Sequence, residues 1–212
     1  MKAGVAISNL QSPVSIGVLG GTFDPPHNGH IAIAEQALTQ LNLDQVLFAP
    51  TGQPPHKQGN PITPIEDRLE MVRLAIANHP RFALSRIDVD RAGPTYTADT
   101  MRLLHEQFGD GVDLYFIMGM DSLANILTWH APEQLIRICK LAVFHRPGFS
   151  ANIDELAKQL PGLRERIVRV PSPAIDIAAS DLQRRIRAGL SIAHLVPPAV
   201  EAYIAQNDLY RM

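Results

Sequence analysis

The fold of this chain is decided by the stretch Ser15-Ile16-Gly17-Val18-Leu19-Gly20-Gly21-Thr22-Phe23-Asp24-Pro25-Pro26-His27-Asn28-Gly29-His30. Its first six residues are a short apolar run that ends in glycine, which is typical of a buried parallel strand feeding a tight turn. From residue 30 to residue 43 the apolar side chains recur at helical spacing. A second apolar run, Gln45 to Pro50, follows. The order strand, glycine turn, helix, strand predicts a β-α-β unit.

The rest of the chain continues this alternation. Further strands are predicted at residues 82–84, 114–118 and 141–144, and further helices at 97–108, 132–138 and 180–188. Another helix is expected to run to about Asn78, with Thr63 as N-cap, Pro64 at the first helical position and Glu66 three residues after the cap. We therefore predict an α/β fold with a doubly wound, mostly parallel sheet, whose ligands bind at the carboxyl ends of the strands.

Length and composition narrow the class of protein. The 212 residues fit a single domain, which we place at residues 15–212 after an N-terminal extension of residues 1–14. A formal charge of -2 with 19% charged residues excludes a general nucleic-acid binder. Cys139 is the only cysteine, so no intrachain disulfide is possible. With neither a signal-peptide core nor an apolar run of about 18 residues, a cytoplasmic protein without a membrane partner is expected.

The segment from Gly20 to His30 suits phosphate binding. The glycines allow the backbone to approach a ligand closely, and the following helix offers unpaired N–H groups at its positive end. His27 and His30 are three residues apart, so on one helical turn their rings can face the same anion. Capping with surface solvation is the alternative for the two histidines. A zinc site is a further alternative, but the pair has no third and fourth ligand at the usual spacing.

Several motifs resemble one family. Gly-Gly-Thr-Phe-Asp-Pro-x-His-x-Gly-His is similar to the signature of the nucleotidyltransferase superfamily of the His-x-Gly-His type, and within it to bacterial nicotinate-mononucleotide adenylyltransferases. The likeness extends to Pro54-Pro55-His56-Lys57, Pro94-Thr95-Tyr96-Thr97, Gly119-x-Asp121-Ser122-Leu123, Thr128-Trp129 and Arg146-Pro147-Gly148. Phosphopantetheine adenylyltransferases and cytidylyltransferases share the first motif but do not resemble the later ones.

The resemblance implies a Rossmann-like fold and adenylyl transfer from MgATP to nicotinate mononucleotide. Mg²⁺ would arrive with ATP, so no protein ligand to the metal is named. His27 and His30 would be the catalytic phosphate donors. The implied ATP site further comprises Gly20, Gly21, Thr22, Phe23, Gly119, Asp121 and Ser180, to which we add Arg184 and Arg187 as our own candidates. The implied acceptor site comprises Thr22, His56, Lys57, Tyr96, Thr97, Trp129 and Arg146.

Several of these residues also have a purely structural interpretation. Trp129 is the only tryptophan and can belong to the core, His56 and Lys57 can be solvated loop charges, and Arg146 can be an ordinary surface arginine. Asp24 is interpreted as a turn residue before Pro25 rather than as a contact behind the substrate.

The sequence departs from the family pattern in two places. Where the family has Ile-Ser-Ser-Thr-x-Ile-Arg, this chain has Ile177-Ala178-Ala179-Ser180-Asp181-Leu182-Gln183. Ser180 is predicted to cap the following helix. Gln183 stands in place of an arginine that contacts the β- and γ-phosphates, and Arg187 or Arg184 is expected to compensate.

The second departure is Thr51, which stands where the family usually has asparagine and leaves a preference for nicotinamide mononucleotide open. A nucleotide-sensing module without turnover is the other alternative. The sequence does not indicate an oligomeric state.

Overall fold

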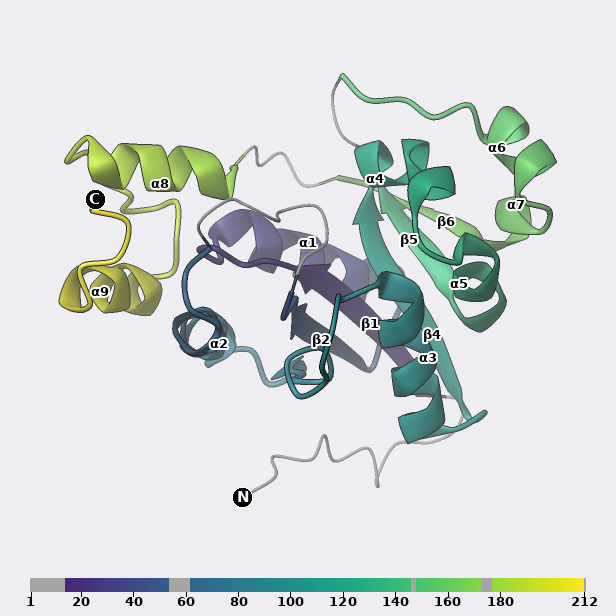
Figure 1. Cartoon of the computed structure of the whole chain (residues 1–212), viewed down its shortest axis with the longest axis horizontal. Helices are drawn as coiled ribbons and strands as arrows, with labels where there is room; N and C mark the ends of the chain where they lie inside the picture. Colours follow the sequence, from purple (N-terminus) through teal and green to yellow (C-terminus); the bar gives the residue numbers. More distant parts are fainter. Residues whose placement is uncertain (1–13, 54–61, 146–147, 173–176, 212) are drawn as a thin grey trace.

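A six-stranded, all-parallel sheet forms the centre of the computed structural model, which describes residues 14–53, 62–145, 148–172 and 177–211 (Figure 1). Its strands are β1 (Val14–Gly21), β2 (Gln45–Pro50), β3 (Phe82–Leu84), β4 (Val112–Gly119), β5 (Lys140–Phe144) and β6 (Ile167–Val170). The strand order is β3-β2-β1-β4-β5-β6. This order reverses between β1 and β4, which makes the carboxyl ends of these two strands the switch point of the sheet.

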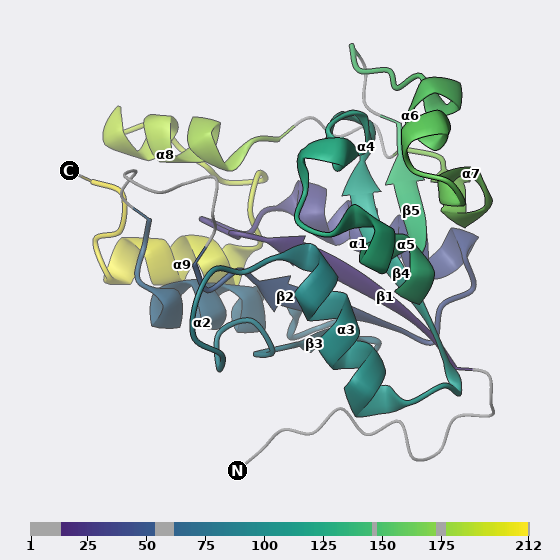
Figure 2. The ribbon, with the colours of Figure 1, turned by 45° about the vertical axis from the view of Figure 1, so that its right-hand side comes forward.

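Helices cover both faces of the sheet (Figures 1 and 2). One face carries α1 (Asn28–Gln40), α2 (Ile65–Ile76), α8 (Ala179–Arg187) and α9 (Pro198–Gln206). The other carries α3 (Thr97–Phe108), α4 (Met120–Ala124), the 3-10 helix η2 (Ile126–Thr128), α5 (Pro132–Ile138), α6 (Ile153–Gln159) and α7 (Leu163–Arg166). The predicted doubly wound α/β architecture is confirmed.

Successive side chains of a strand point to opposite faces of the sheet, so each face has its own hydrophobic core. In β1, Ile16 and Val18 are fully buried in the cluster that includes Met101 of α3, whereas Leu19 joins the cluster that includes Ala34 of α1. Burying each large aliphatic side chain contributes about 1.5–3 kcal/mol. Gly17 allows Leu43 to pack closely against β1, since a Cβ atom there would lie 2.7 Å from Cδ1 of Leu43.

Most of the predicted elements are present, with two kinds of difference. The cap of α2 is Pro64 and not Thr63, because the first hydrogen bond of the helix runs from the Arg68 N–H to the carbonyl of Pro64. The backbone of Thr63 bonds elsewhere: its N–H donates to Asp24 Oδ2, and its carbonyl accepts from the Arg68 side chain. In addition, α6, α7, β6 and α9 were not predicted. Their segments are short, and α6 and α7 lack the length over which a helical period becomes visible.

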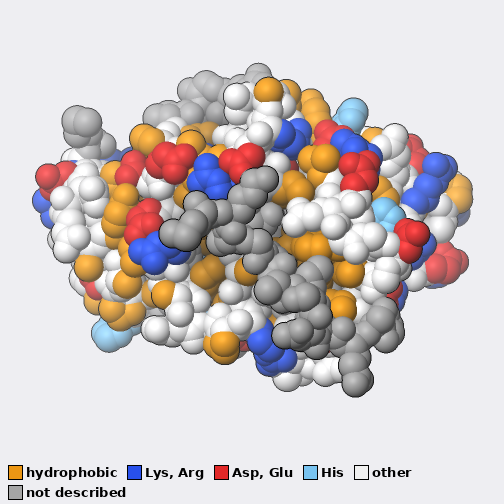
Figure 3. All heavy atoms as spheres, turned by 90° about the horizontal axis from the view of Figure 1, so that it is seen from below, with side chains coloured by type: hydrophobic (Ala, Val, Ile, Leu, Met, Phe, Trp, Pro, Cys, Tyr) orange, Lys and Arg blue, Asp and Glu red, His pale blue; other side chains and the backbone are white. Residues whose placement is uncertain are grey.

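The surface carries charges of both signs. On the face shown in Figure 3, acidic and basic side chains are interspersed and neither sign forms a continuous patch among the described atoms. Within the described ranges, none of the helices combines the length and the apolar character needed to cross a bilayer. Cys139 is buried, and burial raises the pKa of its thiol to about 12, so the thiol stays protonated.

Candidate active site

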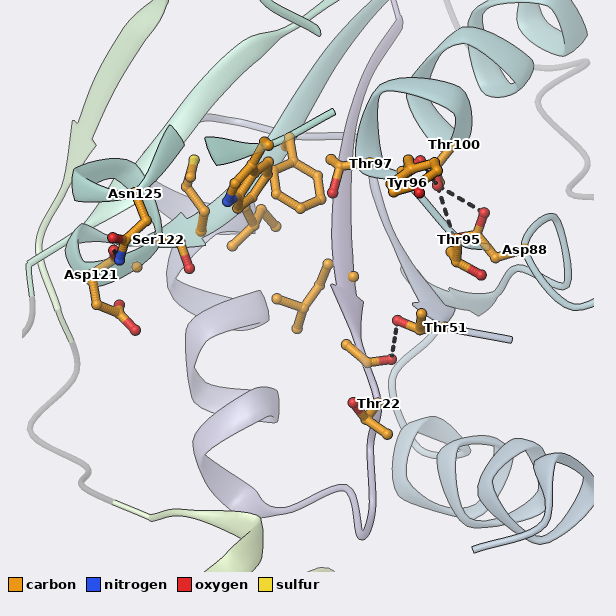
Figure 4. A pocket seen from close by; sticks show the side chains of 18 of the residues that line it. Thr22, Thr51, Asp88, Thr95, Tyr96, Thr97, Thr100, Asp121, Ser122 and Asn125 are labelled. Carbon is orange, nitrogen blue, oxygen red and sulfur yellow. Dashed lines mark hydrogen bonds between the residues drawn. The ribbon is translucent and has the colours of Figure 1, made fainter. Parts of the chain in front are cut away.

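A cavity of about 730 Å³ opens at the switch point, above the carboxyl ends of β1 and β4 (Figure 4). Residues from β1, β4, α3, α4 and η2, and from the segments beside them, form its wall. Those used below are Gly20, Gly21, Thr22, Thr51, Asp88, Thr95, Tyr96, Thr97, Thr100, Phe116, Gly119, Asp121, Trp129 and His130. The volume suits a small organic ligand.

The turn after β1 presents backbone donors at one end of this cavity. Phe23 has a positive φ of 51°, an uncommon conformation for a residue with a side chain, and its ring is buried against Phe48 and His30. Among the described residues, the N–H groups of Thr22 and Phe23 have no hydrogen-bond acceptor. Successive unpaired N–H groups in such a turn form a concavity suited to an anion. Only the backbone of Phe23 is available for this, because its side chain belongs to the core.

His27 and His30 lie together at the start of α1, as their spacing predicts. His27 is the N-cap, and the two rings stack with centroids 3.7 Å apart. The backbone N–H of His27 donates to Nδ1 of His30, so the neutral His30 ring carries its proton on Nε2. Nδ1 of His27 is buried and has no hydrogen-bond partner in the described part of the chain. Two imidazoles therefore keep hydrogen-bonding capacity that the protein itself does not use.

Both histidines are neutral in this environment. Burial lowers the pKa of His27 to about 4. Burial, followed by repulsion from His27, places the pKa of His30 well below its usual value. An incoming polyanion would offset this cost, because a neighbouring negative charge favours the protonated ring.

The opposite wall is formed by the start of α3 and the segment before it. Tyr96 is the N-cap of α3, and Thr97 is the first residue of the helix. Thr100 Oγ1 donates to the Asp88 carboxylate at 2.7 Å, and Arg91 Nε donates to the same group at 3.1 Å. Burial raises the pKa of Asp88, and these donors act in the opposite direction. Asp88 thereby fixes the first turn of α3 relative to the segment before it.

Trp129 follows η2 and is half-buried at the cavity wall, in edge-to-face contact with Phe116 at 5.9 Å. It packs against the core and also faces the cavity, so the two interpretations of this residue are compatible. His130 lies next to it, with its ring 4.4 Å from that of Tyr96. An exposed histidine after a tryptophan gives no sequence signal, and His130 was not predicted.

Gly119 and Asp121 both line the cavity at the end of β4, on the side of α4 (Figure 4). Gly119 is the N-cap of α4, and a Cβ atom there would lie within 2.3 Å of Asp121 Oδ1. The predicted place of these residues beside the ligand is consistent with this geometry. Their contact with adenosine stays a prediction.

Three predicted residues, His56, Lys57 and Arg146, lie outside the described residues. Within the part of the chain that is described, no group of three or more His, Cys, Asp or Glu side chains is arranged to hold a metal ion.

Sequence comparison places the chain in a family. A family model described as cytidylyltransferase-like matches residues 18–187. A relative from Thermomicrobium roseum, named "Probable nicotinate-nucleotide adenylyltransferase", is 47% identical over 92% of this chain and 91% of its own length. A relative of the same name from Herpetosiphon aurantiacus is 45% identical over 92% and 98%. The chain belongs to the nicotinate-nucleotide adenylyltransferase family.

The fold agrees with this membership. The nicotinic acid mononucleotide adenylyltransferase of Plasmodium falciparum, solved in complex with NaAD, superimposes with a TM-score of 0.76. The match covers 93% of this chain and 97% of that one, at 18% sequence identity. At this identity the likeness establishes the fold alone.

The first of the two departures from the family pattern, at residues 177–183, lies in and just before α8. Its N-cap is Ala178, so the predicted capping by Ser180 is wrong: Ser180 is an exposed residue inside the first turn, where it contributes a backbone N–H rather than a cap. Gln183 does not point to solvent, since its Nε2 donates to the carbonyl of Asp24 at 2.7 Å. Arg184 pairs with Asp181 at 2.8 Å. Arg187 has neither an ion pair nor a hydrogen bond within the described residues, which leaves it the better candidate to compensate.

Arg68 is the main residue that sequence reasoning missed. Its guanidinium is buried and donates to the carbonyls of Thr22, Thr51 and Thr63 at 2.9–3.0 Å. It therefore joins the ends of β1 and β2 to the start of α2. Its neighbours in sequence are charged and look like a solvated helix face, and its acceptors are remote backbone groups, so no pattern could have revealed it.

Proposed function

We propose that the chain transfers the adenylyl group of ATP to nicotinate mononucleotide, forming nicotinate adenine dinucleotide and pyrophosphate, as a cytoplasmic step of NAD biosynthesis. The observation that carries the proposal is the stacked, unprotonated pair His27 and His30 at the start of α1, beside the unpaired N–H groups of Thr22 and Phe23. Membership of the adenylyltransferase family supports the same reaction.

The chemistry requires positioning more than proton transfer. The acceptor's own phosphate attacks the α-phosphorus, a new P–O bond forms, and the bond to the leaving pyrophosphate breaks. A phosphate monoester has a second pKa of about 6 and is mostly a dianion at neutral pH, so no general base is needed. What remains is to relieve repulsion between two polyanions and to align them.

The described residues provide groups for these tasks. Nε2–H of His30 and the ring of His27 would donate to phosphate oxygens where negative charge increases during transfer. The N–H groups after β1 would hold the phosphates in the same concavity. Gly119 and Asp121 would lie against the adenosine.

Members of this class of enzyme generally use a divalent metal with ATP, and we propose Mg²⁺ carried as MgATP. A metal that arrives with ATP keeps its waters and substrate oxygens and needs few ligands from the protein. Of the two carboxylates that line the cavity, Asp88 is occupied by Thr100 and Arg91, so Asp121 is the one that could face such a metal.

The acceptor would occupy the wall formed by α3 and Trp129. The indole would stack on the pyridine ring, and Tyr96 and Thr97 at the start of α3 would meet the carboxylate of nicotinate. We keep His56, Lys57 and Arg146 as proposed acceptor contacts from the sequence. The hydroxyl of Thr51 donates to the carbonyl of Gly21 at 3.1 Å, so its proton is already engaged within the protein.

One assay separates the alternatives. Purified protein with MgATP is offered nicotinate mononucleotide, nicotinamide mononucleotide or phosphopantetheine, and pyrophosphate release is followed. We expect release with nicotinate mononucleotide at least about tenfold faster than with the other acceptors. Release with none of them would leave a nucleotide-sensing module. Fastest release with nicotinamide mononucleotide would retain the reaction and replace the acceptor.

A further inference from the structure

Asp24 is a point where four distant segments of the chain meet. Its Oδ1 accepts a hydrogen bond from the hydroxyl of Tyr210 at 2.6 Å, and its Oδ2 accepts one from the N–H of Thr63 at 3.3 Å. Its carbonyl accepts one from Gln183 at 2.7 Å. The residue is only 4% exposed. Asp24 is therefore more than the turn residue that its position before proline indicates.

These hydrogen bonds affect the site because Asp24 lies within the turn that carries site residues. It lies two residues after Thr22, which lines the cavity, and three residues before His27. On the other side of the same turn, Arg68 holds the carbonyls of Thr22 and Thr51. Burial lowers the pKa of Arg68 and the nearby Asp24 carboxylate raises it, so the two buried charges support one another.

The hydrogen bond from Tyr210 to Asp24 persists at every physiological pH. Burial and the Asp24 carboxylate raise the pKa of its hydroxyl, so the group remains a donor throughout the physiological range. Tyr210 packs against the core cluster that contains α1, α2 and α9, and it follows the end of α9 by four residues. The C-terminal segment is thereby attached to the phosphate-binding turn by a short, charge-assisted bond.

We propose that Tyr210 is a positioning residue for adenylyl transfer, which acts through Asp24 to hold the turn from Thr22 to His27 in the geometry that the transferred phosphate requires. Gln183 supports the same turn from α8 in place of a contact with the triphosphate. The inference rests on the proposed function. It gives the C-terminal segment a role in turnover without any contact with substrate.

A matched pair of tyrosines tests this role. Tyr203 also donates to a carboxylate, the half-buried Asp67, whose Oδ1 lies 2.8 Å away, but that carboxylate lies on α2 and not in the turn. Both Tyr210→Phe and Tyr203→Phe remove one hydroxyl that bonds a carboxylate. For Y210F we expect kcat to fall about tenfold, with both KM values within about twofold of wild type. For Y203F we expect kcat to stay within about twofold.

Amide hydrogen exchange separates positioning from general loosening. In Y210F the amides of His27 and Thr63, which are hydrogen-bonded within the turn and to Asp24, should exchange faster than in wild type, whereas in Y203F they should not. Equal kcat values for the two variants, or a fall in kcat that thermal unfolding accounts for in both, would overturn the inference. Absence of turnover by wild-type protein is a different result, because it contradicts the proposed function itself.

A second variant keeps the inference testable if Y210F does not fold. Gln183→Met removes the donor to the Asp24 carbonyl and leaves the C-terminal segment intact. Lower kcat with an unchanged KM for ATP supports the positioning role. A higher KM for ATP with unchanged kcat would assign Gln183 to the triphosphate and contradict it.

Discussion

The two ends of the cavity are held in different ways. At the acceptor end, the start of α3 is fixed by residues close in sequence, since Asp88 binds Arg91 and Thr100. At the phosphate end, the turn after β1 is fixed by Arg68, Gln183 and Tyr210, which are up to 186 residues away from it. The proposed phosphate end therefore depends on segments from across the whole domain, whereas the start of α3 depends on Asp88 and on two hydrogen bonds between Thr95 and Gln53. Changes at the two ends should differ in the kinetic constant that they affect.

The largest effect is expected at the histidine pair. His30→Ala removes the Nε2–H donor and should lower kcat/KM about 10²–10³-fold, the usual cost of losing one donor to a developing charge. His105→Ala, at the far end of α3, is the control and should retain wild-type turnover. Steady-state pyrophosphate release measures both, and a loss of less than about threefold in H30A would contradict the catalytic role.

Arg68→Met should have the next largest effect. It leaves three carbonyls without their donor and the Asp24 carboxylate without its nearby cation, so the free energy of unfolding should fall by about 3 kcal/mol in urea titrations. Arg73→Met on the same helix breaks only the exposed pair with Glu70 and should cost less than about 1 kcal/mol. Equal losses would show that Arg68 does not hold the turn.

The histidine pair should also make stability depend on pH. Because folding lowers the pKa of His27 to about 4 from the ordinary histidine value of 6.5, the unfolded chain binds protons more readily between these values. Stability should therefore fall as the pH falls through this window, by about 2 kcal/mol from His27 alone between pH 7.5 and pH 5. His27→Asn should flatten this slope in urea titrations, and an unchanged slope would contradict the burial of a neutral ring.

The acceptor end should respond through binding. Trp129→Ala should raise the KM for nicotinate mononucleotide about tenfold, because stacking of a ring on an aromatic side chain contributes about 1–3 kcal/mol. The KM for ATP should not change, and Trp129→Phe should recover most of the affinity. A similar rise in both KM values would indicate that Trp129 supports the fold and not the acceptor.

The smallest effect is expected in α8. Arg187→Ala should raise the KM for ATP about threefold, since an exposed cation contributes little more than this. Arg184→Ala, whose guanidinium is paired with Asp181, is the matched change and should have less effect. If the variant with alanine at both positions has the wild-type KM for ATP, neither arginine compensates for Gln183.

The sequence predicted the fold, and its motifs selected most of the residues that we propose for the site. Apolar runs and helical periods identified β1, α1 and β2, and the glycines and histidines between Gly20 and His30 indicated the phosphate site that we propose. These features are local, so they are visible in a linear pattern. The cap of α8 was misassigned to Ser180, because a serine two residues into a helix resembles a cap in sequence.

The support of the site could not be predicted in the same way. Arg68 binds backbone carbonyls, and Tyr210 binds a carboxylate 186 residues away, so neither is marked by spacing or by residue type. Their role depends on which segments the fold brings together. The residues around a site are thus harder to find from sequence than the residues in it.

Isotope transfer tests the central claim most directly. Wild-type protein is incubated with nicotinate mononucleotide and MgATP labelled either in the α-phosphate or in the γ-phosphate, and the products are separated. Adenylyl transfer predicts the α-label in nicotinate adenine dinucleotide and the γ-label in pyrophosphate. The γ-label in the acceptor, or both labels remaining in ATP, would contradict it.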